Sequence, residues 1–417
     1  MKSYNQALNI LKKSKILIED EFINSANCLR RVNAQNVYSN VNYPSADNSS
    51  LDGFAIDAND TKNLDKKKNR LFKILGTLAA GSKPKFQKKN KFQSVEIMTG
   101  SVIPKGFNAI VPLEEVVFYP NKKNAKFIRI NRKVKKKQNV RLKGSDYKKK
   151  NLLIKKGEII ESKHILALKT LGIKKVKVKK IPNILFFSSG KEITDKTNIP
   201  DWKVRDSNSD YIKSLSKKFL INFIKGKTLK DNDKDFFKKE LKKKLHSNID
   251  IIITSGAVSQ GKFDYIPNVI QSFKLSNYFK GVYIRPGKPL LFAKIKNKPK
   301  VIFGLPGNPI SSAACFRFFV YPYLLKSLGI EDEKPISALL KKEFIKKKFF
   351  TRFLKSRLNT TKNGKIEVEI LNGQESFRVK SFVNSNTWTK LPSGKSKFKK
   401  NEIVECFLND NSNKILI

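Results

Sequence analysis

One stretch decides the fold: Ile249-Asp250-Ile251-Ile252-Ile253-Thr254-Ser255-Gly256-Ala257-Val258-Ser259-Gln260-Gly261-Lys262-Phe263-Asp264. Its apolar, β-branched run ends in a turn of small residues. A carboxylate follows, and then the apolar-periodic segment 265–273. This order predicts a buried strand, a loop sized for a phosphate group and the first turn of a helix.

The residues around this stretch alternate between strand and helix patterns. Further short apolar runs, typical of strands, occupy 184–187, 221–224 and 301–303. Helical patterns occupy 209–219, 233–245 and the residues from Ile310 onward. Such alternation predicts a parallel sheet with helices on both faces.

The flanking regions have a different character. Spacing of apolar residues over 1–29 predicts one amphipathic helix. Residues 71–117 alternate short apolar runs with Gly and Pro, which is typical of a small β barrel or sandwich. After Glu331 the pattern is again rich in strands, with candidates at 365–371 and 402–408, so we expect a C-terminal β domain.

Size and composition limit the classes of protein. The 417 residues predict two to four domains. The sequence has no apolar run long enough for a membrane span, no secretory signal and only three widely spaced cysteines, so we expect a cytoplasmic location. The net charge of +52 leaves nucleic-acid binding open, but the excess lysine is spread evenly. That spread favours a compositional origin, and it also suits the steering of an anionic substrate.

Three strand ends in the central region lead into small-residue loops, namely 188–190, 255–259 and 305–309. In a doubly wound sheet these loops meet at the carboxyl edge, where backbone N–H groups bind anions. Acidic residues stand near these loops in an otherwise basic chain: Glu192, Asp206, Asp231 and Asp264. Carboxylates beside phosphates predict Mg²⁺ coordination, although Asp264 could instead cap the helix that follows.

Fixed cations occur in Arg285-Pro286-Gly287-Lys288-Pro289. A proline-fixed turn with two cations suits a bound oxyanion, and a plain surface turn is the alternative.

Taken together, the motifs resemble those of the molybdopterin molybdenumtransferase family, which includes the bacterial MoeA proteins and the E domain of gephyrin. The matching motifs occur in family order at 50–55, 98–104, 114–115, 141–146, 189–193, 205–208, 254–259, 285–289 and 305–309.

The resemblance implies a multidomain α/β plus β architecture. Residues 1–44 and 140–180 would form an N-terminal helical and β linker module, and 45–139 a β-rich module. Residues 181–327 would form a MogA-like parallel α/β domain that binds molybdopterin, and 328–417 a C-terminal β-barrel-like domain. Family members form homodimers whose active site is shared between subunits.

The resemblance also implies a reaction: Mg²⁺-dependent insertion of molybdate into adenylylated molybdopterin, with release of AMP. Glu192 and Asp264 would be the metal ligands. The residues implied in catalysis are Asp52, Asp146, Glu192, Asp231 and Asp264, with Asp52 expected to reach in from the partner subunit. The residues implied in substrate binding are Thr99, Gly100, Ser255, Gly256, Ser259, Arg285, Lys288, Pro306, Asn308, Pro309 and Ser311.

Two positions depart from the family pattern. Lys191 stands where the family usually has Asp, and Gly281 stands where we expect a lysine. The alternative functions are an adenylyltransferase that makes the adenylylated pterin, and a non-catalytic scaffold like the receptor-binding role of gephyrin. The additional β modules favour the molybdenumtransferase over the adenylyltransferase.

Overall fold

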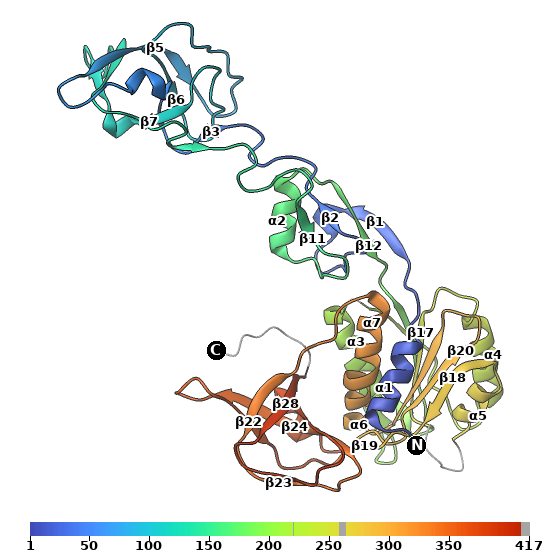
Figure 1. Ribbon diagram of the computed structural model, residues 1–417. Coiled ribbons are helices and arrows are strands. Elements are labelled where there is room, and N and C mark those ends of the chain that lie inside the picture. The colour runs from blue at the N-terminus through green and yellow to red at the C-terminus, as the bar shows by residue number, and fades with distance from the viewer. Residues whose placement is uncertain (220, 258–263, 410–417) are drawn as a thin grey trace.

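The computed structural model describes residues 1–219, 221–257 and 264–409. The chain is elongated (Figure 1). A β-rich unit lies at one end and a smaller unit that contains α2 (Ser162–Thr170) follows it, while an α/β unit and a C-terminal β unit lie together at the other end. Within the described residues, none of the helices has the length and apolar character needed to cross a bilayer.

The α/β unit is built on a sheet with the strand order β16-β13-β17-β21-β20-β18. These strands are β13 (Asn183–Ser188), β16 (Asn222–Lys225), β17 (Ile251–Ser255), β18 (Leu275–Lys280), β20 (Leu291–Ile295) and β21 (Val301–Leu305). β16, β13, β17 and β21 are parallel, as predicted. β20 runs antiparallel to both of its neighbours, β21 and β18, which the sequence patterns did not indicate.

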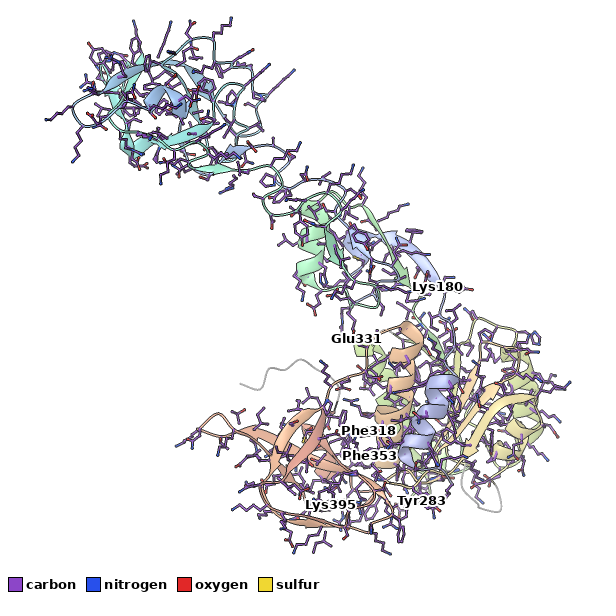
Figure 2. The ribbon with its side chains drawn as sticks, in the orientation of Figure 1. Lys180, Tyr283, Phe318, Glu331, Phe353 and Lys395 are labelled. Atoms are coloured by element: carbon purple, nitrogen blue, oxygen red, sulfur yellow. The ribbon has the colours of Figure 1, made fainter. Side chains whose placement is uncertain are left out.

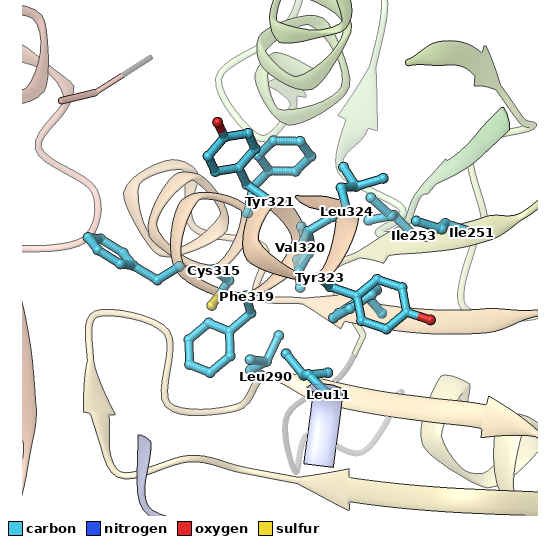
Figure 3. Close-up of a cluster of buried hydrophobic side chains, with 14 of the residues drawn as sticks. Leu11, Ile251, Ile253, Leu290, Cys315, Phe319, Val320, Tyr321, Tyr323 and Leu324 are labelled. Carbon is cyan, nitrogen blue, oxygen red and sulfur yellow. The ribbon is translucent and has the colours of Figure 1, made fainter. Parts of the chain in front are cut away.

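Helices cover both faces of this sheet. One face carries α1 (Tyr4–Lys13), α3 (Ser207–Phe219), α6 (Pro309–Cys315), the π-helical turn η4 (Phe316–Val320) and α7 (Tyr321–Leu328). The other face carries α4 (Lys234–Lys244) and α5 (Ile266–Gln271). Because side chains alternate along a strand, Ile251 and Ile253 of β17 join the first core and Ile252 joins the second. Figure 3 shows Ile251 and Ile253 beside Leu324 of α7.

The prediction of one helix over residues 1–29 is wrong. α1 begins after a Ser3 capping box and ends at Lys13, and β1 (Asp20–Asn24) follows. Ile16 and Ile18 are buried whereas Leu17 between them is 81% exposed. This alternation has the period of an extended chain, so three consecutive apolar residues were misread as part of a helical face.

Two further units lie along the chain between α1 and β13, the first strand of the α/β sheet. The β-rich unit has the strand order β7-β4-β6-β5-β9-β8. Its strands are β4 (Gly53–Ile56), β5 (Arg70–Leu78), β6 (Gln93–Ile97), β7 (Ala109–Pro112), β8 (Val117–Tyr119) and β9 (Phe127–Ile130), with short 3₁₀ helices η2 (Ala58–Thr61) and η3 (Leu113–Glu115). The unit that contains α2 is built from paired strands β1 with β12 (Lys175–Lys179) and β2 (Val37–Tyr38) with β11 (Leu152–Ile154), plus η1 (Ser25–Asn27). β3 (Asn48–Ser49) and β10 (Val140–Arg141) pair where the chain passes between the two units.

The C-terminal unit is a closed barrel with the strand order β24-β25-β22-β28-β26, in which β26 pairs back onto β24. Its strands are β22 (Ile336–Leu340), β24 (Thr351–Thr360), β25 (Ile366–Ile370), β26 (Thr387–Leu391) and β28 (Ile403–Leu408), with β23 (Phe344–Ile345), β27 (Lys397–Phe398) and α8 (Val379–Val383) between them. The predicted strands at 365–371 and 402–408 are thus present.

The barrel is joined to the α/β unit by packing and by strand pairing. The rings of Phe318 and Phe353 stack with centroids 3.8 Å apart, and Figure 2 shows this pair at the boundary of the two units. β19 (Ile284–Arg285), from the α/β unit, pairs in parallel with β24 of the barrel. The contact therefore fixes one wall of the cavity described below.

Candidate functional site

The three predicted loops do meet at one edge of the sheet. Ser188, Ser255 and Leu305 are register partners at the carboxyl ends of β13, β17 and β21. Close approach of these loops requires glycine: a Cβ added to Gly256 (φ +95°) would collide with the carbonyl oxygen of Ser189. The backbone of the second loop therefore packs directly against the first.

An acidic chamber of about 530 Å³ lies over these loops. Its lining includes all four of the predicted acidic residues, Glu192, Asp206, Asp231 and Asp264. The remaining predicted residues of its lining are Ser255, Gly256, Pro306, Asn308 and Pro309. Asp264 directly precedes Tyr265, the N-cap residue of α5, so it lies at the start of this helix as well as in the lining of the chamber. Ser259 lies outside the described residues.

Asn208, the last residue of the motif at 205–208, also lines this chamber, although its position in the motif does not predict a role in the site. Its side-chain amide donates to the Ser255 hydroxyl at 2.7 Å and to the Gly307 carbonyl at 2.8 Å. One side chain near the start of α3 thus ties two of the three loops together. The local sequence pattern around Asn208 does not predict its contacts with Ser255 and Gly307, which are distant in the sequence.

Asp206 has a different role from the other acids. It is 5% exposed and accepts hydrogen bonds from the hydroxyls of Ser188 at 2.5 Å and Ser209 at 2.7 Å, with the Lys225 ammonium at 3.1 Å. Burial alone would raise the pKa of Asp206, but the hydrogen bonds from Ser188, Ser209 and Lys225 outweigh it and lower the pKa. Its carboxylate therefore stabilises the end of β13.

A larger, basic chamber of about 910 Å³ adjoins the acidic one. The two chambers share Pro289, Pro306 and Asn308 in their linings, so they adjoin at these residues. The predicted oxyanion binders Arg285 and Lys288 line the basic chamber. Ser311 of α6 also lines it, rather than the acidic side.

Arg352 is a residue of the basic chamber that the sequence analysis missed. It comes from β24 of the barrel, and the register of β19 and β24 places it beside Arg285. Its Nε is buried without a hydrogen-bond partner among the described residues. Burial and the charge of Arg285 both lower the pKa of Arg352. A guanidinium kept in this environment is suited to an anionic ligand.

Four predicted residues are not brought to this cavity within one chain. Asp52 lies between β3 and β4, and its carboxylate accepts hydrogen bonds from both the amide and the hydroxyl of Thr99, each at 2.7 Å. These bonds lower the pKa of Asp52. Gly100 follows Thr99, and Asp146 lies just beyond β10. Figure 1 shows this end of the molecule far from the α/β unit.

The carboxylates of the acidic chamber fit a magnesium ion in chemical kind. Among the described residues, no group of three or more His, Cys, Asp and Glu side chains is placed to hold a metal ion by itself. Mg²⁺ typically binds through one or two carboxylates together with substrate phosphates and water. Glu192 and Asp264, which line one chamber, meet that requirement in donor type and number.

Comparisons with known proteins cover nearly the whole chain. Three family models match: "MoeA N-terminal region (domain I and II)" over residues 2–172, "Probable molybdopterin binding domain" over 186–326 and "MoeA C-terminal region (domain IV)" over 337–408. A molybdopterin molybdenumtransferase of Staphylococcus epidermidis is 30% identical over 98% of this chain and 96% of its own length. A protein of the same name from Staphylococcus aureus is 31% identical over 92% of this chain and 89% of its own.

Solved structures agree with the sequence matches. A molybdopterin biosynthesis MoeA protein from Pyrococcus horikosii has 28% sequence identity and a TM-score of 0.82, with 98% of each chain covered. The resemblance noted from the motifs is thereby confirmed, as is the predicted fold class. The chain belongs to the molybdopterin molybdenumtransferase family of transferase enzymes.

Proposed function

We propose that this protein inserts molybdate into adenylylated molybdopterin and releases AMP, in a reaction that requires Mg²⁺. The observation that carries the proposal is that an acidic and a basic chamber adjoin, with Pro289, Pro306 and Asn308 in both linings. A substrate with a pyrophosphate group and a separate oxyanion calls for two neighbouring chambers of this kind.

The basic chamber is the proposed site for molybdate. Four cations, Arg285, Lys288, Lys342 and Arg352, line this chamber together with the carboxylates of Glu343, Glu369 and Glu375. The positive charge is most concentrated where Arg285 and Arg352 are register partners, and a tetrahedral dianion bound there would neutralise it. Arg352 offers a buried donor, which an oxyanion could satisfy. Placing molybdate here would set it beside a pterin that extends from the acidic chamber.

The acidic chamber is the proposed site for the pyrophosphate. Glu192 and Asp264 would hold Mg²⁺, which when bound offsets the charge of the phosphate oxygens. The tight packing of Gly256 against the Ser189 carbonyl holds two of the loops close together. Asn208 keeps Ser255 and Gly307 at fixed positions, so the loops need little reorganisation when phosphates bind.

A second subunit would complete the site. Asp52 accepts hydrogen bonds from Thr99, Gly100 follows Thr99, and Asp146 lies beyond β10. An antiparallel homodimer would bring the β-rich end of the molecule to the partner's α/β unit. The hydrogen bonds from Thr99 keep Asp52 ionised, so it would contribute a negative charge near the metal. Both the dimer and this role are proposals.

The direct test mixes the purified protein with adenylylated molybdopterin, molybdate and Mg²⁺. We expect AMP to be released in step with formation of a cofactor that activates a molybdenum-free apo-enzyme, and we expect EDTA to stop both. Absence of AMP release at any Mg²⁺ concentration would overturn the proposed reaction. Binding of the pterin without turnover would instead support the scaffold alternative.

A further inference from the structure

The loop 371–378, between β25 and α8, forms most of the barrel side of the basic chamber. Every residue from Leu371 to Phe377 lines that chamber. The amide of Ile310, in α6, donates to the Ser376 carbonyl at 3.2 Å, so the loop also contacts the wall formed by the α/β unit. Its position therefore decides the shape of the chamber.

A buried lysine holds this loop from behind. Lys355 of β24 is 1% exposed, and its ammonium donates to the carbonyls of Gly373 at 2.6 Å, Arg378 at 3.0 Å and Glu375 at 3.1 Å. All three donors of the ammonium are thus directed at one loop. Burial lowers the pKa of Lys355 to about 8, as expected for a cation placed in the protein interior.

Two neutral side chains support the same arrangement. Gln374 donates to the carbonyls of Lys355 at 2.8 Å and Leu371 at 2.7 Å, and the Ser381 hydroxyl donates to the Gly373 carbonyl at 2.7 Å. Because a trans peptide is planar, a carbonyl directed at Lys355 turns the following N–H the opposite way. The N–H groups of Gln374 and Ser376 therefore point away from the lysine.

We propose that Lys355 is a positioning residue for oxyanion binding, which sets the loop 371–378 against Arg285 and Arg352. It acts through the loop, because Lys355 is not among the described residues that line the chamber. The proposal rests on the proposed function, since molybdate is taken as the ligand of that chamber. No other buried charge in the described barrel contacts this loop through three carbonyls.

The chain offers a matched control. Lys300 is also buried, at 7% exposed, and its ammonium donates to two carbonyls, those of Ser247 and Ile249. It precedes β21, at the end of the sheet opposite the chambers. Lys300→Met should therefore destabilise the fold without changing the basic chamber, whereas Lys355→Met should change both.

The test measures the affinity for molybdate alone by calorimetry, the melting temperature, and amide hydrogen exchange over 371–378. We expect Lys355→Met to weaken molybdate binding about tenfold and to raise amide exchange in that loop. Lys300→Met should lower the melting temperature by a similar amount but keep the wild-type affinity for molybdate. Wild-type affinity in Lys355→Met would overturn the proposal, as would unchanged exchange in the loop. If Lys355→Met does not fold, Ser381→Ala serves in its place, with the same expected direction and the same contradicting outcomes. Failure of the wild-type protein to bind molybdate would count against the proposed function instead.

Discussion

Arg285 and Arg352 are register partners on two parallel strands, β19 and β24, which come from different units of the chain. Burial is the larger cause of the lowered pKa of Arg352, and repulsion from the neighbouring Arg285 adds to it. The arrangement favours function over stability, because a bound anion would remove the repulsion.

Replacing Arg352 tests that relationship. Arg352→Gln should weaken molybdate binding at least about tenfold, because a charge-assisted donor to the anion is lost, while the melting temperature stays the same or rises. Arg357→Gln on the same strand is the control, since Arg357 is exposed and donates to the Asn384 carbonyl. Unchanged affinity in Arg352→Gln would exclude this residue from the anion site.

The metal ligands can be tested without disturbing the fold. Glu192→Gln and Asp264→Asn should each lower the rate of AMP release and raise the Mg²⁺ concentration needed for half-maximal rate by about tenfold or more. Asp201→Asn, at an exposed position before β15 (Val204–Arg205), should leave both unchanged. If both site variants kept the wild-type Mg²⁺ dependence, the assignment of the metal would be wrong.

Asp206 should control stability in a pH-dependent way. Its folded-state pKa lies below the ordinary 3.8, so its contribution is complete above pH 3.8 and is lost as the pH falls through the folded pKa. Asp206→Asn should lower the free energy of unfolding at pH 7 by roughly 1–3 kcal/mol. The difference from wild type should shrink below pH 3.8, and urea titrations across pH 7 to 2.5 would measure it.

Asp210→Asn is the control for that experiment, because Asp210 is exposed in the first turn of α3. It should change the free energy of unfolding little at any pH. A difference between Asp206→Asn and wild type that stayed constant as the pH fell would contradict the described role of the buried carboxylate.

If the site is shared between subunits, two inactive variants that lack residues from opposite sides of the site should restore activity when they are mixed. Asp52→Ala and Glu192→Gln should each be inactive alone. Random exchange of their subunits should restore about a quarter of the wild-type AMP release, because half of the dimers would be mixed and each would contain one intact site. Mixtures that stay at the background rate, despite subunit exchange seen by mass spectrometry, would place Asp52 outside the partner's site.

Much of the α/β unit was predictable from the sequence because buried parallel strands appear as continuous apolar runs. Ile251 to Ile253 is such a run, and it is buried on both faces. Convergence of the loops then follows from the topology. The reversed direction of β20 has no comparable signal, and the run at Ile16 to Ile18 fits a helix as well as an extended chain.

The missed site residues share one physical reason. Asn208, Arg352 and Lys355 act through contacts with segments distant in the sequence, and those contacts depend on packing and register. In a chain with 87 lysine and arginine residues, one more basic residue on a predicted strand carries little information. Asp206 was grouped with the site carboxylates because its hydrogen-bond partners cannot be read from spacing.

The central claim is that the basic chamber binds molybdate beside an acidic chamber for the pyrophosphate. Anomalous diffraction at the molybdenum absorption edge, from crystals soaked in molybdate, tests it most directly. The account predicts a molybdenum peak between Arg285, Lys288 and Arg352, and its loss in Arg352→Gln crystals. A peak among Glu192, Asp231 and Asp264, or no peak in the cavity at millimolar molybdate, would contradict it.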